Sequence, residues 1–257
     1  MTRCSAWLGL ALVVLMCSPA AGADVAQFLA AGDEALTKFD LQAAVDAYRE
    51  ARHAAPDNYE AAWKFSRALA DKATLSRIRA EVEQLCIDAE TAGRDAVRLS
   101  PNDSKGHAYL SIAVGKRAMF AGGKCKVELS KEVKTEADKA IELNPKENLA
   151  YHVLGVWNRE MADLNWMLKK FAEMFYGRFP PASLDEAVKD LRKASELAPT
   201  VVSHQVELGI TLAAARKWPE AKSTLEHALA MPKVWVTDDY YKGLAKQKLE
   251  VVKAHLD

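Results

Sequence analysis

The sequence predicts an all-α fold, a right-handed solenoid of about five antiparallel helix pairs with a capping helix at its C-terminal end. Three observations lead to this prediction. Apolar residues recur at spacings of three and four, as they do along one face of a helix. Glycine and proline are scarce, at 12 and 9 of 257 residues. A short phrase, in which a proline follows an alanine by four or five residues, ends five successive segments. Such a repeat is typical of stacked helix pairs that share one core.

The repeated phrase places a small residue and a helix breaker at fixed points of each unit. Its alanine lets the paired helices approach closely, and its proline cannot continue a helix and so begins the next turn. The pairs are Ala51 and Pro56, Ala96 and Pro101, Ala140 and Pro145, Ala194 and Pro199, and Ala228 and Pro232. This phrase resembles the end of the second helix of a tetratricopeptide repeat (TPR), so we expect a TPR-like solenoid.

The first and last units fit the TPR frame of about 34 residues better than the others. In the first unit the matching positions are Phe28, Gly32, Ala44, Tyr48, Ala51 and Pro56. In the last unit they are Leu208, Gly209, Trp218, Ala221, Leu225, Ala228 and Pro232. The three middle units are longer, and their extra residues fall between the two helices of each unit. We expect lengthened helices there rather than long loops.

A final helix is predicted to start near Thr237. Thr237 is a suitable N-cap, and the two aspartates after it place negative charge in the first turn. An apolar stripe follows, made of Tyr241, Ala245, Leu249, Val252 and Leu256. Because the end of a solenoid exposes the apolar face that a next repeat would cover, we interpret this helix as the cap.

The fourth unit has the most individual sequence. Its first helix is expected to run from Leu149 through Trp157 to Tyr176, with Gly177 ending it, and a capping box from Ser183 to Glu186 opens the next helix. An aromatic cluster falls in this unit, formed by Trp166, Phe171, Met174, Phe175, Tyr176 and Phe179. Aromatic residues at helical spacing usually belong to the core, but an exposed binding wedge or a ligand pocket around Trp166 is the alternative.

The first 23 residues have the pattern of an export signal rather than of a folded element. Arg3 precedes an apolar run over residues 6–16, and Ala21-Gly22-Ala23 is a small-residue cleavage site. We therefore divide the chain into a signal peptide, 1–23, and a TPR-like domain, 24–257, and expect a periplasmic or secreted protein. A lipid tether through Cys17 is the alternative, although Met16 stands where a small residue is needed.

Charge and cysteine content narrow the function further. The 35 basic and 35 acidic side chains balance, so we expect neither a nucleic-acid partner nor an anionic membrane surface. No segment after the signal is apolar enough to span a bilayer, and we expect no transmembrane segment in a soluble mature chain. Cys86 and Cys125 would form a disulfide or stay as two buried thiols, and they lack metal-ligand spacing.

Motifs of catalysis are missing from the sequence. It has no glycine-rich phosphate loop, no His-Glu-x-x-His and no Gly-x-Ser-x-Gly, so we predict that the protein is not an enzyme and needs no cofactor or metal. His107, His152 and His204 fall at similar points of three successive first helices. They either stack into a metal or pH-sensing face or are polar residues that the repeat tolerates.

A set of local sequences resembles the regulator of microtubule dynamics family over about residues 26–256. They are Gly155-Val156-Trp157, Leu164-Asn165-Trp166, Lys169-Lys170, Phe175-Tyr176-Gly177, Pro180, Glu186-Ala187 and residues 193–199, with residues 60–68 and 137–145 upstream. The resemblance implies a TPR-like fold and a protein-binding role. Known members associate with microtubules or lie at mitochondrial and endoplasmic reticulum membranes. An exported chain would meet no microtubule, so we expect a different partner.

In TPR solenoids the first helices line a concave face that holds the partner. By repeat position this nominates Trp63, Arg67, Ile112, Lys116, His152, Arg159, Val206 and Ile210. The combination of basic groups and apolar side chains suits an extended or helical peptide with an acidic residue. Trp63 could equally be a core residue at an aromatic TPR position.

We therefore predict a non-enzymatic interaction scaffold that binds a protein or peptide partner in this groove. Two alternatives remain at this point. One is a lipid-tethered envelope assembly factor, and the other is a small-ligand or metal-binding helical protein.

Overall fold

The computed structural model describes residues 20–163 and 181–256, and these form eleven helices and no strand. The helices are α1 (Ala20–Thr37), α2 (Leu41–Ala54), α3 (Tyr59–Leu75), α4 (Arg79–Leu99), α5 (Ser104–Ala118), α6 (Gly123–Leu143), α7 (Asn148–Asp163), α9 (Leu184–Leu197), α10 (Val202–Ala214), α11 (Trp218–Ala230) and α12 (Asp238–Lys253). They pack as the pairs α1–α2, α3–α4, α5–α6, α7–α9 and α10–α11, and α12 packs on the last pair. The predicted fold class, an all-α solenoid of five helix pairs and a final helix, is confirmed.

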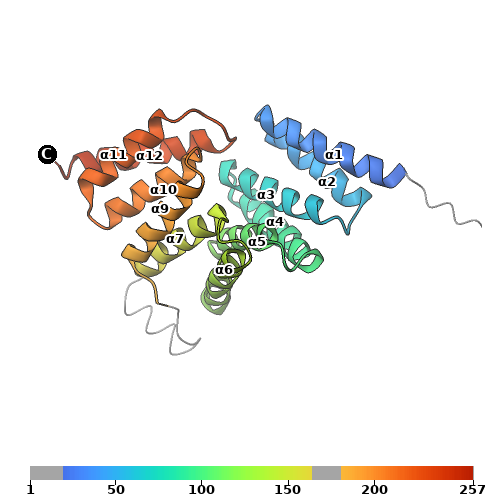
Figure 1. The fold of residues 1–257 in the computed structure, drawn as a ribbon, viewed down its shortest axis with the longest axis horizontal. Helices are drawn as coiled ribbons and strands as arrows, with labels where there is room; N and C mark the ends of the chain where they lie inside the picture. Colours follow the sequence, from blue (N-terminus) through green and yellow to red (C-terminus); the bar gives the residue numbers. More distant parts are fainter. Residues whose placement is uncertain (1–19, 164–180, 257) are drawn as a thin grey trace, which may run out of the picture.

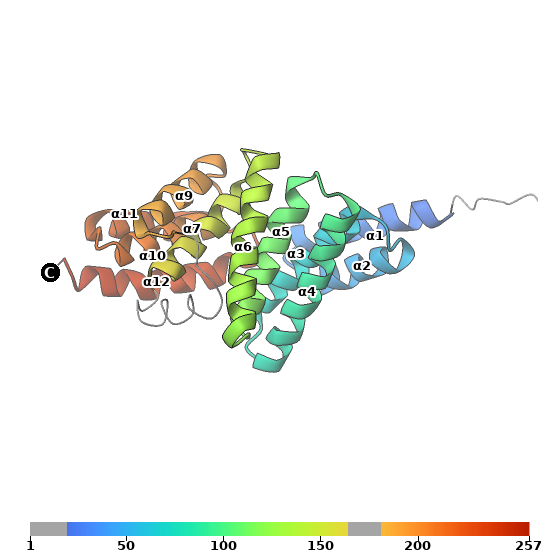
Figure 2. The same cartoon turned by 90° about the horizontal axis from the view of Figure 1, so that it is seen from below.

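The helix pairs stack side by side along an arc (Figures 1 and 2). The inner row is formed by α3, α5, α7 and α10, each of which contacts the next. We call the surface of these four helices the concave face. The residues that link α11 to α12, 231–237, reach back across the open side of the arc toward the turn between α1 and α2 (Figure 1). We call residues 231–237 the C-terminal segment.

The repeated alanine–proline phrase ends the second helix of each unit as predicted. Helices α2, α4, α6, α9 and α11 each end two residues before the proline of the phrase, because the residue before a proline disfavours helical backbone angles. The five alanines, at 51, 96, 140, 194 and 228, are fully buried.

Close helix contact also explains a glycine of the first unit. A Cβ atom on Gly32 would lie 2.4 Å from the ring of Tyr48, which is fully buried and donates its hydroxyl to the carboxylate of Asp33 at 2.7 Å. The fourth unit repeats the arrangement, since a Cβ atom on Gly155 would lie 2.4 Å from Leu191. Side chains of the second helix thus fill the space that each glycine leaves.

The middle units are lengthened by longer helices, as expected. Helices α4 and α6 have 21 residues each, whereas α2 has 14 and α11 has 13. In the fourth unit α7 is described to Asp163, so the predicted continuation to Tyr176 and the aromatic cluster of residues 166–179 lie outside the described residues. The next helix starts as predicted, because the Ser183 hydroxyl accepts the backbone N–H of Glu186 at 3.1 Å.

The C-terminal helix has the predicted position, with two differences. Thr237 stands at its N-cap but makes no side-chain capping bond, and the carboxylate of Asp238 instead accepts backbone N–H groups of the C-terminal segment. Ala245, Leu249 and Val252 of the predicted stripe are buried. Leu256 is not part of the cap, because it lies beyond the end of α12 and is 43% exposed.

The two cysteines of the domain match neither expectation. Cys86 is buried and Cys125 is exposed, and both are free thiols. The disulfide prediction is therefore wrong, and so is the prediction of two buried thiols. Within residues 20–163 and 181–256, none of the helices combines the length and apolarity that crossing a bilayer requires.

Candidate binding groove

The second unit contributes an aromatic and cationic stack to the concave face. Trp63 is 8% exposed and stacks on Tyr109 of α5, with ring centroids 5.4 Å apart. The guanidinium of Arg67, one turn along α3, lies 5.4 Å from the Trp63 ring and 4.9 Å from the ring of Trp235. Trp63 therefore has the burial of a core residue, while Arg67 joins the concave face to the C-terminal segment.

Asp71 continues the same stripe of α3 and was missed in the sequence. Its carboxylate accepts the indole N–H of Trp235 at 3.1 Å. Burial raises the pKa of Asp71 to about 6, against the opposing effects of Arg67 and of the indole N–H. Trp63, Arg67 and Asp71 recur every four residues, so helical spacing could have placed Asp71 on this face. The sequence held no comparable signal for Trp235.

The third unit supplies Ile112 and Lys116, both half-buried. The ammonium of Lys116 donates to the hydroxyl of Thr74 at 2.6 Å. Burial lowers the pKa of Lys116, while Asp71 on α3 and Glu207 on α10 act in the opposite direction. This lysine stands at the centre of the concave face, where three units meet.

Lys116 also lines a half-open cavity of about 300 Å³ between the second and third units and α12. Thr74 and Glu207 provide its other polar groups near the lysine, and Tyr241 and Leu244 of α12 form part of its apolar wall. The cavity is at the lower end of the size range of small-molecule sites. Its position shows that α12 covers one part of the concave face.

The fourth and fifth units are joined by charges and imidazoles. Arg159 of α7 donates to Glu207 at 2.6 Å and to the Thr211 hydroxyl at 3.1 Å. The side chains of Arg159 and Glu207 are 13% and 12% exposed. A partner would have to compete with this pair, because both groups already satisfy each other.

His152 and His204 meet directly, with their Nδ1 atoms 3.0 Å apart. His204 is fully buried and its Nε2 contacts the side-chain oxygen of Asn148 at 2.8 Å. That oxygen accepts a proton held on Nε2, so Nδ1 of His204 accepts from Nδ1–H of His152. Burial lowers the pKa of His152 to about 4 and that of His204 to about 2.

Two predicted members of the groove need correction or a narrower role. Val206 is fully buried in the core of the fifth unit and is not available to a partner. Ile210 is half-buried and packs against the same core. The apolar spacing of α10 could not tell which of its faces packs on the neighbouring helices.

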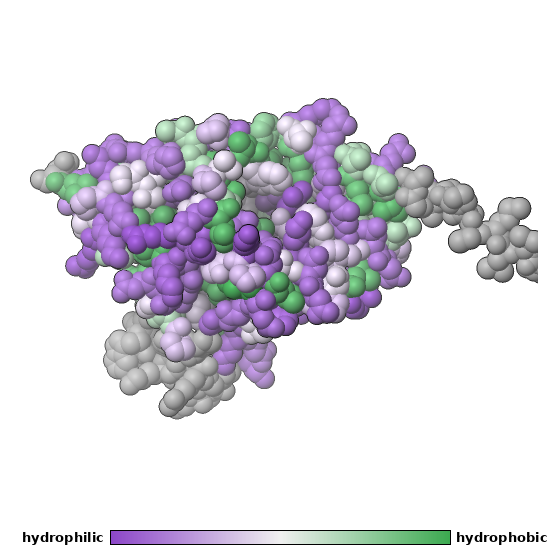
Figure 3. All heavy atoms as spheres, in the orientation of Figure 1, coloured by the Kyte–Doolittle hydropathy of each residue, from purple (hydrophilic) through white to green (hydrophobic). Residues whose placement is uncertain are grey.

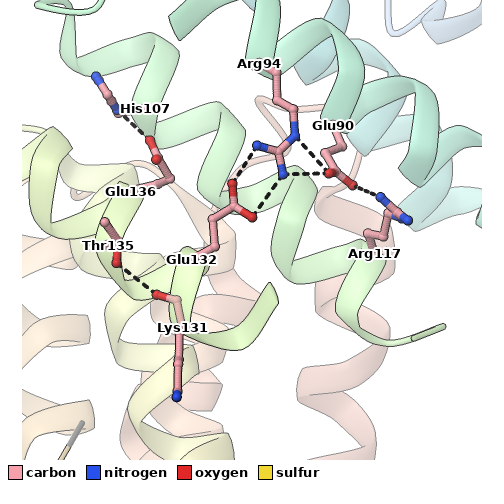
Figure 4. A network of polar contacts seen from close by, with 8 residues as sticks. All are labelled: Glu90, Arg94, His107, Arg117, Lys131, Glu132, Thr135 and Glu136. Carbon is pink, nitrogen blue, oxygen red and sulfur yellow. Dashed lines mark hydrogen bonds and ion pairs between the residues drawn. The ribbon is translucent and has the colours of Figure 1, made fainter. Parts of the chain in front are cut away.

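The predicted row of three histidines is also wrong in one member. His107 contacts Glu136 of α6 at 2.6 Å (Figure 4) and the Pro101 carbonyl at 2.9 Å. Only His152 and His204 meet as predicted. Among the residues that the structure describes, no group of three or more His, Cys, Asp or Glu side chains could hold a metal ion.

A second polar network lies at the junction of α4, α5 and α6. The carboxylate of Glu90, which is 5% exposed, accepts from Arg94 at 2.8 Å and from Arg117 at 2.6 Å. Arg94 also pairs with Glu132 at 2.7 Å, so its guanidinium bridges α4 and α6 (Figure 4). These groups satisfy one another and stabilise the packing of neighbouring units.

The face of the molecule that is seen in Figure 1 has a largely hydrophilic surface, with small separate apolar areas (Figure 3).

Helix pairs with a common alanine–proline ending, stacked into an arc with polar and aromatic groups on its inner row, define a TPR-like helical-repeat protein. Solved structures support this class. A thermophilic TPR protein of Thermus thermophilus aligns with a TM-score of 0.65 at 15% identity, over 87% of this chain and 99% of that one.

The family model for "Regulator of microtubule dynamics protein 1-3" matches residues 28–253, and the chain belongs to this family. Among its relatives, regulator of microtubule dynamics protein 1 of Mus musculus is 27% identical over 58% of this chain and 49% of its own length. Regulator of microtubule dynamics protein 2 of Bos taurus is 29% identical over 56% of this chain and 35% of its own. The aligned region thus spans half or less of these relatives.

Proposed function

We propose that the protein is a non-enzymatic scaffold that binds a protein or peptide partner along the concave face. The observation that carries this proposal is the row of cationic and aromatic side chains on neighbouring inner helices. Arg67 and Trp63 lie on α3, Lys116 lies on α5 and Arg159 lies on α7. The TPR-like fold and the family membership support an interaction role.

The chemistry of this row favours a peptide with acidic and aromatic residues. A guanidinium pairs with a carboxylate in two parallel hydrogen bonds and stacks on aromatic rings. Arg67 already contacts two indole rings, whereas the pair between Arg159 and Glu207 leaves that part of the face less open to a charged partner. We therefore place the partner mainly on the second and third units.

We further propose that the protein is exported and works in the periplasm or outside the cell. Residues 1–23 support this with Arg3, an apolar run and the cleavage site that ends at Ala23. The microtubule activity in the names of the relatives belongs to those proteins, and we propose a different partner here. Intact-mass analysis of the exported chain checks the proposal. A chain that begins at Asp24 supports it, and an added lipid at Cys17 would favour a tethered envelope factor instead.

Site-specific photo-crosslinking in the source organism tests the groove. A photoreactive residue replaces Lys105, which is exposed on α5 with its ammonium 5.1 Å from the Trp63 ring. The control replaces Ile87, which is exposed on the outer helix α4. We expect one partner, identified by mass spectrometry, to be captured from position 105 and not from position 87. Equal capture from both positions would argue against the concave face.

A small-ligand function is the second candidate, and the cavity beside Lys116 is the observation that favours it. A thermal-shift screen of anionic metabolites tests this function with Lys116→Met as the matched variant. A ligand that raises the melting temperature of the wild type but not of K116M would support it.

A further inference from the structure

The C-terminal segment resembles a bound peptide, because local hydrogen bonds stabilise its backbone conformation. Pro232, Lys233 and Val234 are exposed. The carboxylate of Asp238 accepts the backbone N–H groups of Val234 at 2.9 Å and of Trp235 at 2.7 Å. These local bonds fix the turn before α12, so the shape of the segment depends little on the helices that it lies against.

Side chains attach this segment to the far end of the solenoid. The indole N–H of Trp235 donates to Asp71, 164 positions earlier in the chain. The Trp235 ring lies against Arg67 and packs, together with Val236, on the core of the first two units. Lys233 places its ammonium 4.7 Å from the Phe39 ring at the turn between α1 and α2. Trp235 is therefore the residue of the segment that contacts both Arg67 and Asp71.

The site beneath Trp235 is suited to another aromatic residue. Without Trp235, the half-buried carboxylate of Asp71 would lose its N–H donor, and the guanidinium of Arg67 would lose one of its two rings. A buried acceptor without a donor is unfavourable. The site therefore favours a ligand with an N–H group on a large flat ring, and the indole of Trp235 shows that a tryptophan side chain meets both requirements.

We propose that Trp235 is an intramolecular ligand that a partner's tryptophan displaces from the site formed by Arg67 and Asp71. This inference rests on the proposed scaffold function and specifies its ligand, a peptide with a tryptophan followed three residues later by an aspartate, as in Trp235 and Asp238. The partner binds more weakly while Trp235 occupies the site, because only the open fraction of molecules is competent to bind.

The experiment uses a fluorescein-labelled synthetic peptide with the sequence of residues 230–244. It is titrated into the full chain as wild type, as Trp235→Ala and as the matched control Val234→Ala, whose side chain is exposed. We expect W235A to bind the peptide about tenfold or more tightly than the wild type and V234A, because the open fraction approaches one. A second peptide with alanine in place of the tryptophan should bind to none of the three.

Equal affinity of the wild type and W235A would overturn the proposal, and so would the absence of binding to W235A with wild-type circular dichroism. If W235A does not fold, Trp235→Phe serves instead, because it keeps an aromatic ring, although a smaller one, and removes the N–H donor to Asp71. It should bind the peptide more tightly than the wild type, and wild-type affinity would overturn the proposal. Wild-type dimers that exchange the segment between copies, detected by sedimentation, would also overturn it. Capture from position 105 stays the separate test of the scaffold function.

Discussion

The two ends of the concave face are held together in different ways. At the N-terminal end, Arg67 and Asp71 contact Trp235, a residue 164 positions away from Asp71, through one hydrogen bond and one stacking contact. At the C-terminal end, Arg159 and Glu207 form a charge pair between adjacent units, and His152 and His204 form an imidazole pair beside it. The first contact closes the solenoid on itself, whereas the second joins consecutive repeats.

The contact of Trp235 lies outside the packing between neighbouring repeats, whereas the contacts of Arg159 and His152 are part of that packing. Adjacent repeats lose their shared core if they separate, because α7, α9 and α10 pack against one another. Loss of the contact between the C-terminal segment and the N-terminal end would separate none of the five helix pairs, because each pair packs through its own two helices. We therefore expect the loss of the Arg159–Glu207 pair to lower stability and the loss of the Trp235 contact to alter binding.

The largest expected effect is the loss of the charge pair at the C-terminal end. Arg159→Ala leaves Glu207 nearly buried without its cation, and this should lower the free energy of unfolding by about 3 kcal/mol. Arg192→Ala is the matched control, since its pair with Glu220 is 47% and 44% exposed and is worth at most about 1 kcal/mol. Urea denaturation measures both. Similar losses of stability for the two variants would show that burial does not increase the contribution of the Arg159–Glu207 pair.

The imidazole pair predicts a loss of stability in acid. The pKa of His152 is lowered to about 4 by burial, so protonation favours the unfolded chain, and stability present above pH 6.5 is lost as the pH falls toward 4. The size is on the order of 2 kcal/mol or more. The double variant His152→Gln, His204→Gln should lose less stability than the wild type between pH 7 and pH 4.5 in urea titrations. His53→Gln, at an exposed position, should keep the wild-type slope, and an unchanged slope in the double variant would contradict the assignment.

The sequence was sufficient for the features that local chemistry determines. Each proline ends a helix two residues upstream, and each repeated alanine is buried, because both effects act within one helix pair. Periodicity also placed His152 beside His204, since their helices are neighbours. It failed for His107, whose partner Glu136 lies on the second helix of its own unit.

The contact between Asp71 and Trp235 could not be predicted in this way. It depends on the curvature of the whole solenoid, which is the sum of small rotations between successive units. Trp235 also lies outside any helix, so no periodicity marks the direction of its side chain. Val206 was assigned to the groove wrongly for a different reason. Helix α10 is apolar on more than one face, so spacing alone could not tell which face packs in the core.

The N-terminal end should respond to pH in the opposite direction. The pKa of Asp71 is raised to about 6 by burial, so its ionisation disfavours the folded state, and stability falls as the pH rises from about 4 to 6. Asp71→Asn keeps an acceptor for Trp235 and removes the charge. It should raise the free energy of unfolding by about 1 kcal/mol at pH 7, after allowance for the partial exposure of Asp71. At pH 4 it should leave the free energy of unfolding nearly unchanged. A loss of stability at pH 7 would mean that the charge of Asp71 is needed beside Arg67.

The smallest effect is expected at the tip of the C-terminal segment. Lys233 contacts the Phe39 ring and pairs with Asp239 at 2.6 Å, but the two side chains of that pair are 35% and 71% exposed. Lys233→Ala should change the free energy of unfolding by no more than about 0.5 kcal/mol. It should also leave the affinity for the 230–244 peptide at the wild-type value, because Trp235 keeps its site. A clear increase in peptide affinity for K233A would show that the segment is anchored at its tip as well as by its indole, and the opening of the N-terminal end would then require the release of both contacts.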